Sequence, residues 1–131
     1  MKTVLVIDDD PDIRELVTWK LTQAGYATLA AADGEEGLAV ALAGDTDGRL
    51  PDLILVDWMM PKMTGIEVCR SVRANPVMGR IPIILLTANA QEDEVESGFA
   101  AGVDDYILKP FSPRELLGRI QAVLSRSEAR T

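Results

Sequence analysis

The sequence predicts an α/β domain built on a five-stranded parallel sheet with helices on both faces. Three observations carry this prediction. Short runs of aliphatic and β-branched residues alternate with segments whose apolar residues recur at helical spacing. Several runs are apolar at consecutive positions, as in strands buried on both faces of a parallel sheet. The alternation continues along the whole chain, and right-handed crossovers turn such an order into one sheet covered on both sides.

Length and composition are those of one globular domain. The chain has 131 residues, 47% of them hydrophobic, which is enough for one core, and no apolar run is long enough to cross a membrane. With Cys69 as its one cysteine and no histidine, the chain has no internal disulfide, Ser-His triad, histidine-ligated metal or histidine phosphocarrier. Its net charge of -8 disfavours direct nucleic-acid binding, which needs a basic surface.

Three strands and two helices are expected in the first half. Asp10 is a natural N-cap with Pro11 at the first helical position, and Gly25 ends that helix. Asp33 and Glu36 have the spacing of a capping box for the second helix. The expected strands are residues 3–7, 26–31 (a weaker strand at an edge) and 53–57, and the expected helices are residues 11–24 and 34–42.

The second half repeats the alternation. Thr64 with Glu67, and Ser112 with Glu115, again have capping-box spacing. The expected strands are residues 82–87 and 103–108, and the expected helices are residues 65–74, 91–101 and 113–124. The apolar face of the helix over 91–101 is thin, which predicts a loosely held helix. We expect one domain over residues 1–126 and a polar tail over 127–131.

Polar side chains follow four of the five expected strands: Asp8 and Asp9, then Asp57, Thr87 and Lys109. The carboxyl ends of parallel strands share one edge of a sheet, where α/β folds place their ligands. Three carboxylates together repel one another, and a divalent cation relieves that repulsion; a set of oxygen ligands favours Mg²⁺. A carboxylate can act as a nucleophile to give an acyl phosphate, and an ammonium and a hydroxyl can bind phosphoryl oxygens.

In combination, these motifs resemble the response-regulator receiver domains of two-component signalling. The residues that carry the resemblance are Val-Ile-Asp-Asp over 6–9, Val-Asp-Trp-Met-Met-Pro over 56–61 with Gly65, Leu-Leu-Thr-Ala over 85–88 and Asp-Asp-Tyr-Ile-Leu-Lys-Pro-Phe over 104–111. The resemblance runs from about residue 2 to about residue 126. It implies the flavodoxin-like strand order 2-1-3-4-5.

The resemblance also implies a role for each residue of the site. Asp57 would be the phosphoacceptor, with Asp9, Asp57 and the main-chain carbonyl of Met59 as direct Mg²⁺ ligands and Asp8 acting mainly through water. Thr87 and Lys109 would bind the phosphoryl oxygens. The donor would be a sensor histidine kinase or a histidine phosphotransfer protein, which implies a cytoplasmic protein.

A switch is implied as well. On phosphorylation Thr87 would move toward the phosphoryl group and Tyr106, the switch aromatic, would turn inward, which changes the face made by the helix after Thr87, the fifth strand and the last helix. The Lys109-Pro110 bond matches one that is usually cis in the family. A homodimer through this face is a further expectation, although Val95 stands where dimerising relatives usually have a basic residue. The charged residues that resemble theirs are Asp104, Asp105, Glu115, Arg119 and Arg126.

Other classes of protein fit these residues less well. A phosphatase with an aspartyl nucleophile would need a second aspartate where Met59 stands, and a flavodoxin would need a Ser/Thr/Gly-rich phosphate loop in the first turn. A receiver-like interaction module that takes no phosphoryl group would have lost an acid or the lysine, and none is lost. In the family, the lifetime of the phosphorylated state depends on the residues two positions after the phosphoacceptor and two positions after Thr87, which are Met59 and Asn89 here. Met59 has no group to orient water, so we expect a long-lived phosphorylated state. The chain is either a stand-alone regulator or part of a longer one.

Overall fold

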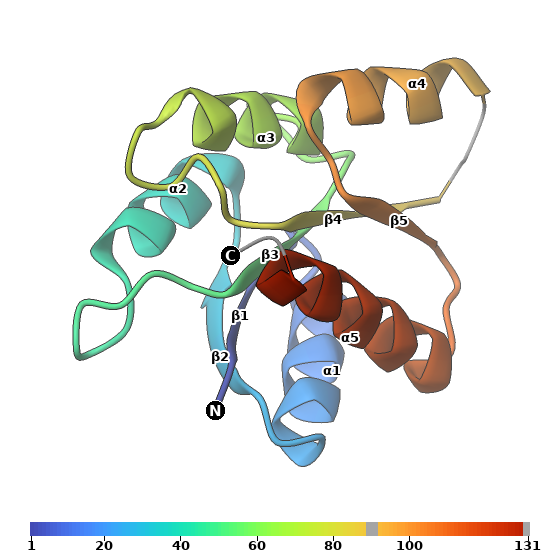
Figure 1. The fold of residues 1–131 in the computed structure, drawn as a ribbon. Helices are drawn as coiled ribbons and strands as arrows, with labels where there is room; N and C mark the ends of the chain where they lie inside the picture. Colours follow the sequence, from blue (N-terminus) through green and yellow to red (C-terminus); the bar gives the residue numbers. More distant parts are fainter. Residues whose placement is uncertain (89–91, 130–131) are drawn as a thin grey trace.

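The computed structural model describes residues 1–88 and 92–129, except the side chains of residues 92–95 and 129. A parallel sheet of five strands in the order β2-β1-β3-β4-β5 forms the centre of the molecule (Figure 1), as predicted. The strands are β1 (Thr3–Ile7), β2 (Ala27–Ala31), β3 (Leu53–Asp57), β4 (Ile83–Thr87) and β5 (Asp105–Leu108). The helices are α1 (Pro11–Gln23), α2 (Gly34–Ala43), α3 (Gly65–Ala74), α4 (Glu92–Ala101) and α5 (Pro113–Ala129).

Side-chain alternation along the strands divides the core into two layers. In β1, Val4 and Val6 pack with the buried residues of α1 and α5, whereas Leu5 and Ile7 pack with those of α2 and α3. Figure 1 shows the same arrangement, with α1 and α5 on one face of the sheet and α2, α3 and α4 on the other. Both faces of the central strands are therefore buried, which is why their sequences are apolar at consecutive positions.

The predicted helix starts have the expected capping residues. Thr64 and Glu67 form a full capping box, in which each side chain accepts from the other residue's main-chain N–H, at 3.2 and 3.0 Å. Asp33 accepts from the Glu36 N–H at 2.8 Å, but the Glu36 carboxylate accepts from the N–H of Ala32. At the start of α2, the hydrogen bond back from Glu36 therefore goes to the residue before the N-cap instead of to the N-cap itself.

Element bounds differ from the predictions at a few ends. β5 begins at Asp105, two residues later than predicted, and just before it the Asp104 N–H donates to the Ile83 carbonyl at 2.8 Å. α5 continues through Ala129, so residues 127–129 are helical. The Lys109-Pro110 peptide is cis, as the resemblance implies. Asn89 and Gln91 lie outside the described residues.

Arg73 joins the carboxyl end of α3 to two other segments. Its guanidinium donates to the carbonyls of Gly102 (at 2.8 and 3.1 Å), Gly79 (3.2 Å) and Ile81 (2.6 Å), and pairs with Asp104 at 2.9 Å. Asp104 also accepts from the N–H of Ile83 at 2.8 Å. This network fixes the connections that enter β4 and β5. No helix of the described chain is both long and apolar enough to span a membrane.

Candidate functional site

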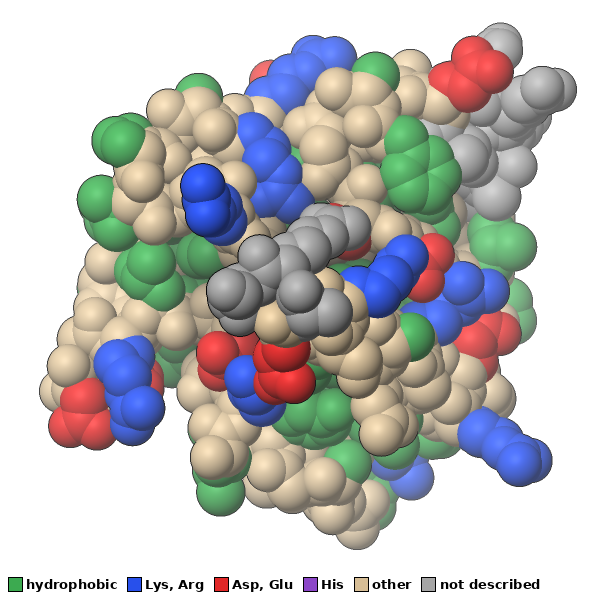
Figure 2. Space-filling view, viewed as in Figure 1, with side chains coloured by type: hydrophobic (Ala, Val, Ile, Leu, Met, Phe, Trp, Pro, Cys, Tyr) green, Lys and Arg blue, Asp and Glu red, His purple; other side chains and the backbone are tan. Residues whose placement is uncertain are grey.

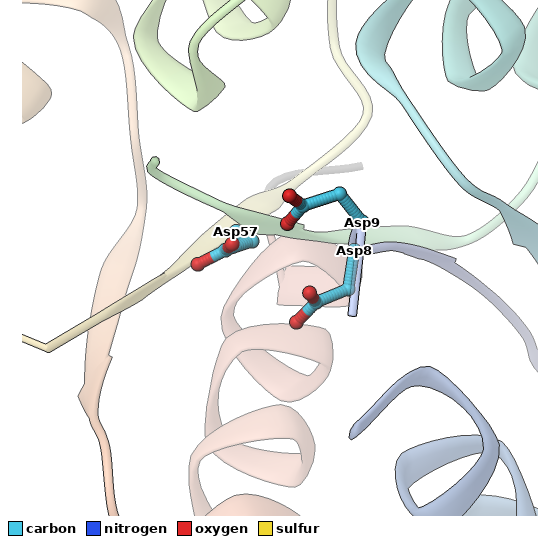
Figure 3. A group of neighbouring side chains, drawn as sticks. All are labelled: Asp8, Asp9 and Asp57. Carbon is cyan, nitrogen blue, oxygen red and sulfur yellow. The ribbon is translucent and has the colours of Figure 1, made fainter. Parts of the chain in front are cut away.

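Three carboxylates converge at the carboxyl edge of β1 and β3. These strands are neighbours in the sheet, with Ile7 opposite Val56, so Asp8 and Asp9 at the end of one lie beside Asp57 at the end of the other (Figure 3). One oxygen from each lies within 4.8 Å of the others. Since carboxylate oxygens are the ligands that Mg²⁺ prefers, this donor set fits that ion.

The three acids differ in exposure. Asp8 is fully buried and Asp57 is 7% exposed, whereas Asp9 is exposed to solvent. The carboxylates of Asp8 and Asp57 are thus buried at this edge of the sheet, and that of Asp9 lies at the protein surface. A ligand that approaches from solvent would meet Asp9 first, with Asp57 behind it.

Lys109 balances the buried acids. Its Nζ atom lies 3.0 Å from Asp57 Oδ1 and 3.3 Å from Asp8 Oδ2. The side chains of Lys109, Asp57 and Asp8 are each at most 19% exposed, so solvent screens these charges weakly. The lysine predicted at the end of the fifth strand therefore reaches the acids at the ends of the first and third.

The electrostatics of the cluster change the acidity of its members. Burial, with smaller contributions from the charges of Asp8 and Asp9, raises the pKa of Asp57 from 3.8 to about 6. The hydrogen bond and charge of Lys109 oppose this rise. Burial acts to lower the pKa of Lys109, but its bonds and charge pairing with Asp57 and Asp8 outweigh burial and raise that pKa. At neutral pH the site therefore holds an ionised Asp57 beside a cationic lysine.

Thr87 and Tyr106 lie at the predicted places. Thr87 ends β4 with 3% exposure, and its carbonyl accepts from the Lys109 N–H at 2.8 Å. Tyr106 lies opposite Leu85 in the sheet, is 9% exposed, and packs in the layer covered by α2 and α3. Its ring meets the edge of the Phe99 ring at a centroid distance of 5.1 Å. The tyrosine side chain is therefore turned inward.

The loops around the acids are held by local contacts. Asp10 caps α1 by accepting from the N–H groups of Asp12 and Ile13, as predicted, while Asp8 accepts from the N–H of Asp10 at 2.9 Å. Arg14 donates to the Asp8 carbonyl at 2.7 Å. This last contact was not predicted, because a bond to a main-chain carbonyl leaves no pattern in the sequence.

The loop after β3 depends on a glycine. The Gly65 N–H donates to the Trp58 carbonyl at 2.9 Å, and a Cβ atom at Gly65 would lie 2.6 Å from the Asp57 carbonyl oxygen. Only a residue without a side chain lets α3 begin this close to the strand. In the same loop the Met59 side chain is 74% exposed and stands beside the acid cluster in sequence.

Curated relatives match almost the whole chain. It is 46% identical over 126 residues to the phosphate regulon transcriptional regulatory protein PhoB of Pseudomonas aeruginosa, which covers 96% of this chain and 53% of that protein. It is 44% identical over 127 residues to the alkaline phosphatase synthesis transcriptional regulatory protein PhoP of Bacillus subtilis, covering 97% of this chain and 50% of the relative. The chain thus spans about half the length of these curated relatives.

Solved structures agree with this match. The chemotaxis protein CheY4 of Vibrio cholerae superposes with a TM-score of 0.87 at 37% identity, over 94% of this chain and 98% of that one. A CheY-like receiver domain protein from Methanospirillum hungatei gives 0.88 at 30% identity, over 100% and 99%. The model of the response regulator receiver domain matches residues 4–121. This chain belongs to the response regulator receiver domain family of two-component systems, whose members are phosphoacceptors rather than ordinary enzymes and imply a cognate histidine kinase.

Proposed function

We propose that this chain is a phosphorylation-dependent signalling switch that accepts a phosphoryl group on Asp57. The donor is the phosphohistidine of a sensor histidine kinase or of a histidine phosphotransfer protein. One observation carries the proposal: Asp57 is a nearly buried carboxylate with Lys109 at 3.0 Å and two further acids within ligand distance of one cation. The receiver domain is proposed to be residues 1–126, and the protein is proposed to act in the cytoplasm.

The transfer step follows from the charges of the site. An oxygen of the ionised Asp57 attacks phosphorus, a P–O bond forms, and the P–N bond to the donor imidazole breaks with its electron pair staying on nitrogen. The product is an acyl phosphate on Asp57. Because the pKa of Asp57 lies at about 6, the carboxyl group is mostly ionised at neutral pH and needs no separate base.

The neighbouring side chains have separate tasks. Lys109 moves its ion pair from Asp57 to a phosphoryl oxygen, and the hydroxyl of Thr87 donates to another. Asp8, Asp9, Asp57 and the main-chain carbonyl of Met59 would hold Mg²⁺, with Asp8 acting mainly through water; the three acids are typical of a receiver Mg²⁺ site. When bound, Mg²⁺ supplies positive charge that offsets the repulsion between the acids and the phosphoryl oxygens.

The output is a change in the face formed by α4, β5 and α5. Phosphorylation adds roughly 1.5 to 2 negative charges and three acceptor oxygens, which draw Thr87 toward Asp57. Tyr106 is already buried in this structure, so phosphorylation would raise the population of that inward position rather than create it. The modification thereby shifts a population between two packings of the face rather than creating a new fold.

This face is also the proposed surface for a homodimer. Arg119 pairs with Asp105 at 3.2 Å and approaches Glu115 at 3.9 Å, and Figure 2 shows acidic and basic side chains intermixed on the side where α5 faces the viewer. Asp104 is held by Arg73 within the chain. Pairing between two copies would thus exchange internal ion pairs for external ones, which favours a weak, phosphorylation-dependent dimer. Sedimentation that does not change with concentration in the phosphorylated form would contradict it.

Intact mass measurement tests the phosphoacceptor proposal. The protein is incubated with Mg²⁺ and acetyl phosphate, with Asp57→Ala as the control. A gain of one phosphoryl group in the parent and none in the variant supports both the chemistry and its site. If the folded parent gains no phosphoryl group, the interaction-module alternative replaces this proposal.

A further inference from the structure

Gly98 lies inside α4, where a glycine is unfavourable. The helix runs from Glu92 to Ala101, and the Gly98 carbonyl accepts from the N–H of Val103 at 3.0 Å. Glycine inside a helix lowers stability relative to alanine, because the unfolded chain gains backbone freedom. A buried glycine at such a position calls for a reason in the surrounding structure.

The reason is the phenol of Tyr106. A Cβ atom built on Gly98 would overlap the Tyr106 hydroxyl oxygen and lie 2.6 Å from Cζ and 3.3 Å from Cε1. These are distances that cannot be relieved by a small shift, since the ring is already packed against Phe99 and is 9% exposed. The inward tyrosine thus occupies the volume that any other residue at position 98 would use.

We propose that Gly98 is a positioning residue: its lack of a side chain leaves the space that the inward Tyr106 phenol occupies, and this sets the balance between the inward and outward positions of Tyr106. The consequence for signalling rests on the proposed function, in which phosphorylation favours the inward position. A side chain at position 98 excludes the inward phenol, so the apparent affinity for a phosphoryl group or its mimic falls by the fraction of molecules that remain competent.

Gly118 offers a matched control. It lies in α5, and a Cβ atom there has no atom within 4 Å. Both Gly98→Ala and Gly118→Ala replace a helical glycine by alanine, so both gain the same helix propensity. They differ in whether the new methyl group meets Tyr106.

The position of Tyr106 is measured directly by ¹⁹F NMR on protein labelled with 3-fluorotyrosine, without phosphorylation. The chain has two tyrosines, so Tyr26→Phe assigns the signals and Tyr26 serves as the internal reference. Gly98→Ala is expected to move the Tyr106 resonance and increase its broadening by a soluble paramagnetic agent, with Tyr26 unchanged. Gly118→Ala is expected to leave both signals in place. An unchanged Tyr106 signal in folded Gly98→Ala overturns the proposal.

Thermal unfolding keeps the proposal testable if Gly98→Ala folds poorly. In a Tyr106→Ala background, Gly98→Ala is expected to raise Tm by about 3 to 5 °C, as Gly118→Ala does, because only helix propensity changes. With Tyr106 present, the same substitution is expected to lower Tm. A similar change in Tm in both backgrounds would overturn the proposal that Gly98 makes room for Tyr106.

Phosphorylation separates this inference from the proposed function. If the parent gains no phosphoryl group from acetyl phosphate, the proposed function fails. The ¹⁹F measurement still decides whether Gly98 controls the position of Tyr106. Beryllofluoride, a phosphoryl mimic, tests the link to signalling in a parent that is phosphorylated. If Gly98→Ala binds it as tightly as Gly118→Ala does, Gly98 has no part in the switch and the proposal is overturned.

Discussion

Replacing Asp57, the proposed phosphoacceptor, with its neutral amide is expected to stabilise the metal-free protein. Asp57 has a pKa of about 6 against an ordinary value of 3.8, so its ionisation in the folded state is unfavourable by about 2 pKa units. At about 1.4 kcal/mol per unit, this destabilises the native state by about 3 kcal/mol at neutral pH. Asp57→Asn removes that penalty, and the pKa of about 6 already includes the opposing Lys109 contact at 3.0 Å. We therefore expect a gain of about 2–3 kcal/mol in the free energy of unfolding.

The pH dependence of this gain has a definite sign. A carboxyl group whose folded-state pKa is raised binds its proton more tightly in the folded protein than in the unfolded one. Its unfavourable contribution is absent below about pH 4, grows between about pH 4 and pH 6, and is complete above that range. The difference between Asp57→Asn and the parent is therefore expected to be small at about pH 4.5 and largest above about pH 7.

Urea unfolding with chelator present measures this difference at both pH values. Addition of Mg²⁺ should stabilise the parent more than the variant, because the ion binds a folded site that contains the Asp57 carboxylate. A variant that is less stable than the parent at pH 7.5 without metal would refute the reasoning. So would an advantage that is the same at the two pH values, because it could not come from ionisation.

Three further substitutions give expected outcomes. Arg73→Ala should lower the free energy of unfolding by about 3 kcal/mol in urea, because it removes the Arg73–Asp104 ion pair and the guanidinium's hydrogen bonds to three main-chain carbonyls. Arg70→Ala, on the exposed side of the same helix, should change it by less than about 0.5 kcal/mol; equal losses would contradict this. Thr64→Ala should lower it by about 1 kcal/mol in thermal unfolding through loss of the capping box, and no change would show that the cap is dispensable. Met59→Asn should shorten the lifetime of the acyl phosphate in a time course of intact mass, because an amide beside the site can orient water, and an equal or longer lifetime would count against that role.

Much of the fold could be predicted because buried parallel strands have a distinctive sequence. Consecutive apolar residues such as Leu53 to Val56 are needed when both faces of a strand are covered, and glycine, proline and capping residues mark the ends of the helices. The places of Asp8, Asp57 and Lys109 at one edge follow from the parallel order alone. Their relative exposure does not, because it depends on how the loops above them fold.

Contacts to the main chain and contacts between distant segments could not be predicted. Arg73 has the sequence context of an ordinary surface arginine on an amphipathic helix, yet its guanidinium binds carbonyls of two loops. Asp104 was expected on a charged outer face and instead accepts from Arg73 and from the Ile83 N–H. The relation between Gly98 and Tyr106 is likewise invisible in sequence, since it depends on the exact approach of α4 to β5.

The Arg73 network also determines how α4 can move. The guanidinium binds the Gly102 carbonyl, and Cys69 Sγ donates to the Ala101 carbonyl at 3.3 Å, so the carboxyl end of α4 is attached to α3. The amino end is the one that follows Thr87 in the chain. Displacement of this helix is therefore expected to be a tilt about its carboxyl end rather than a translation. With ten residues, α4 is about 15 Å long, and a tilt of about 10° moves its amino end by about 3 Å. Spin-label pairs between α3 and α4 should then change their separation most at the amino end of α4 and least beside Arg73.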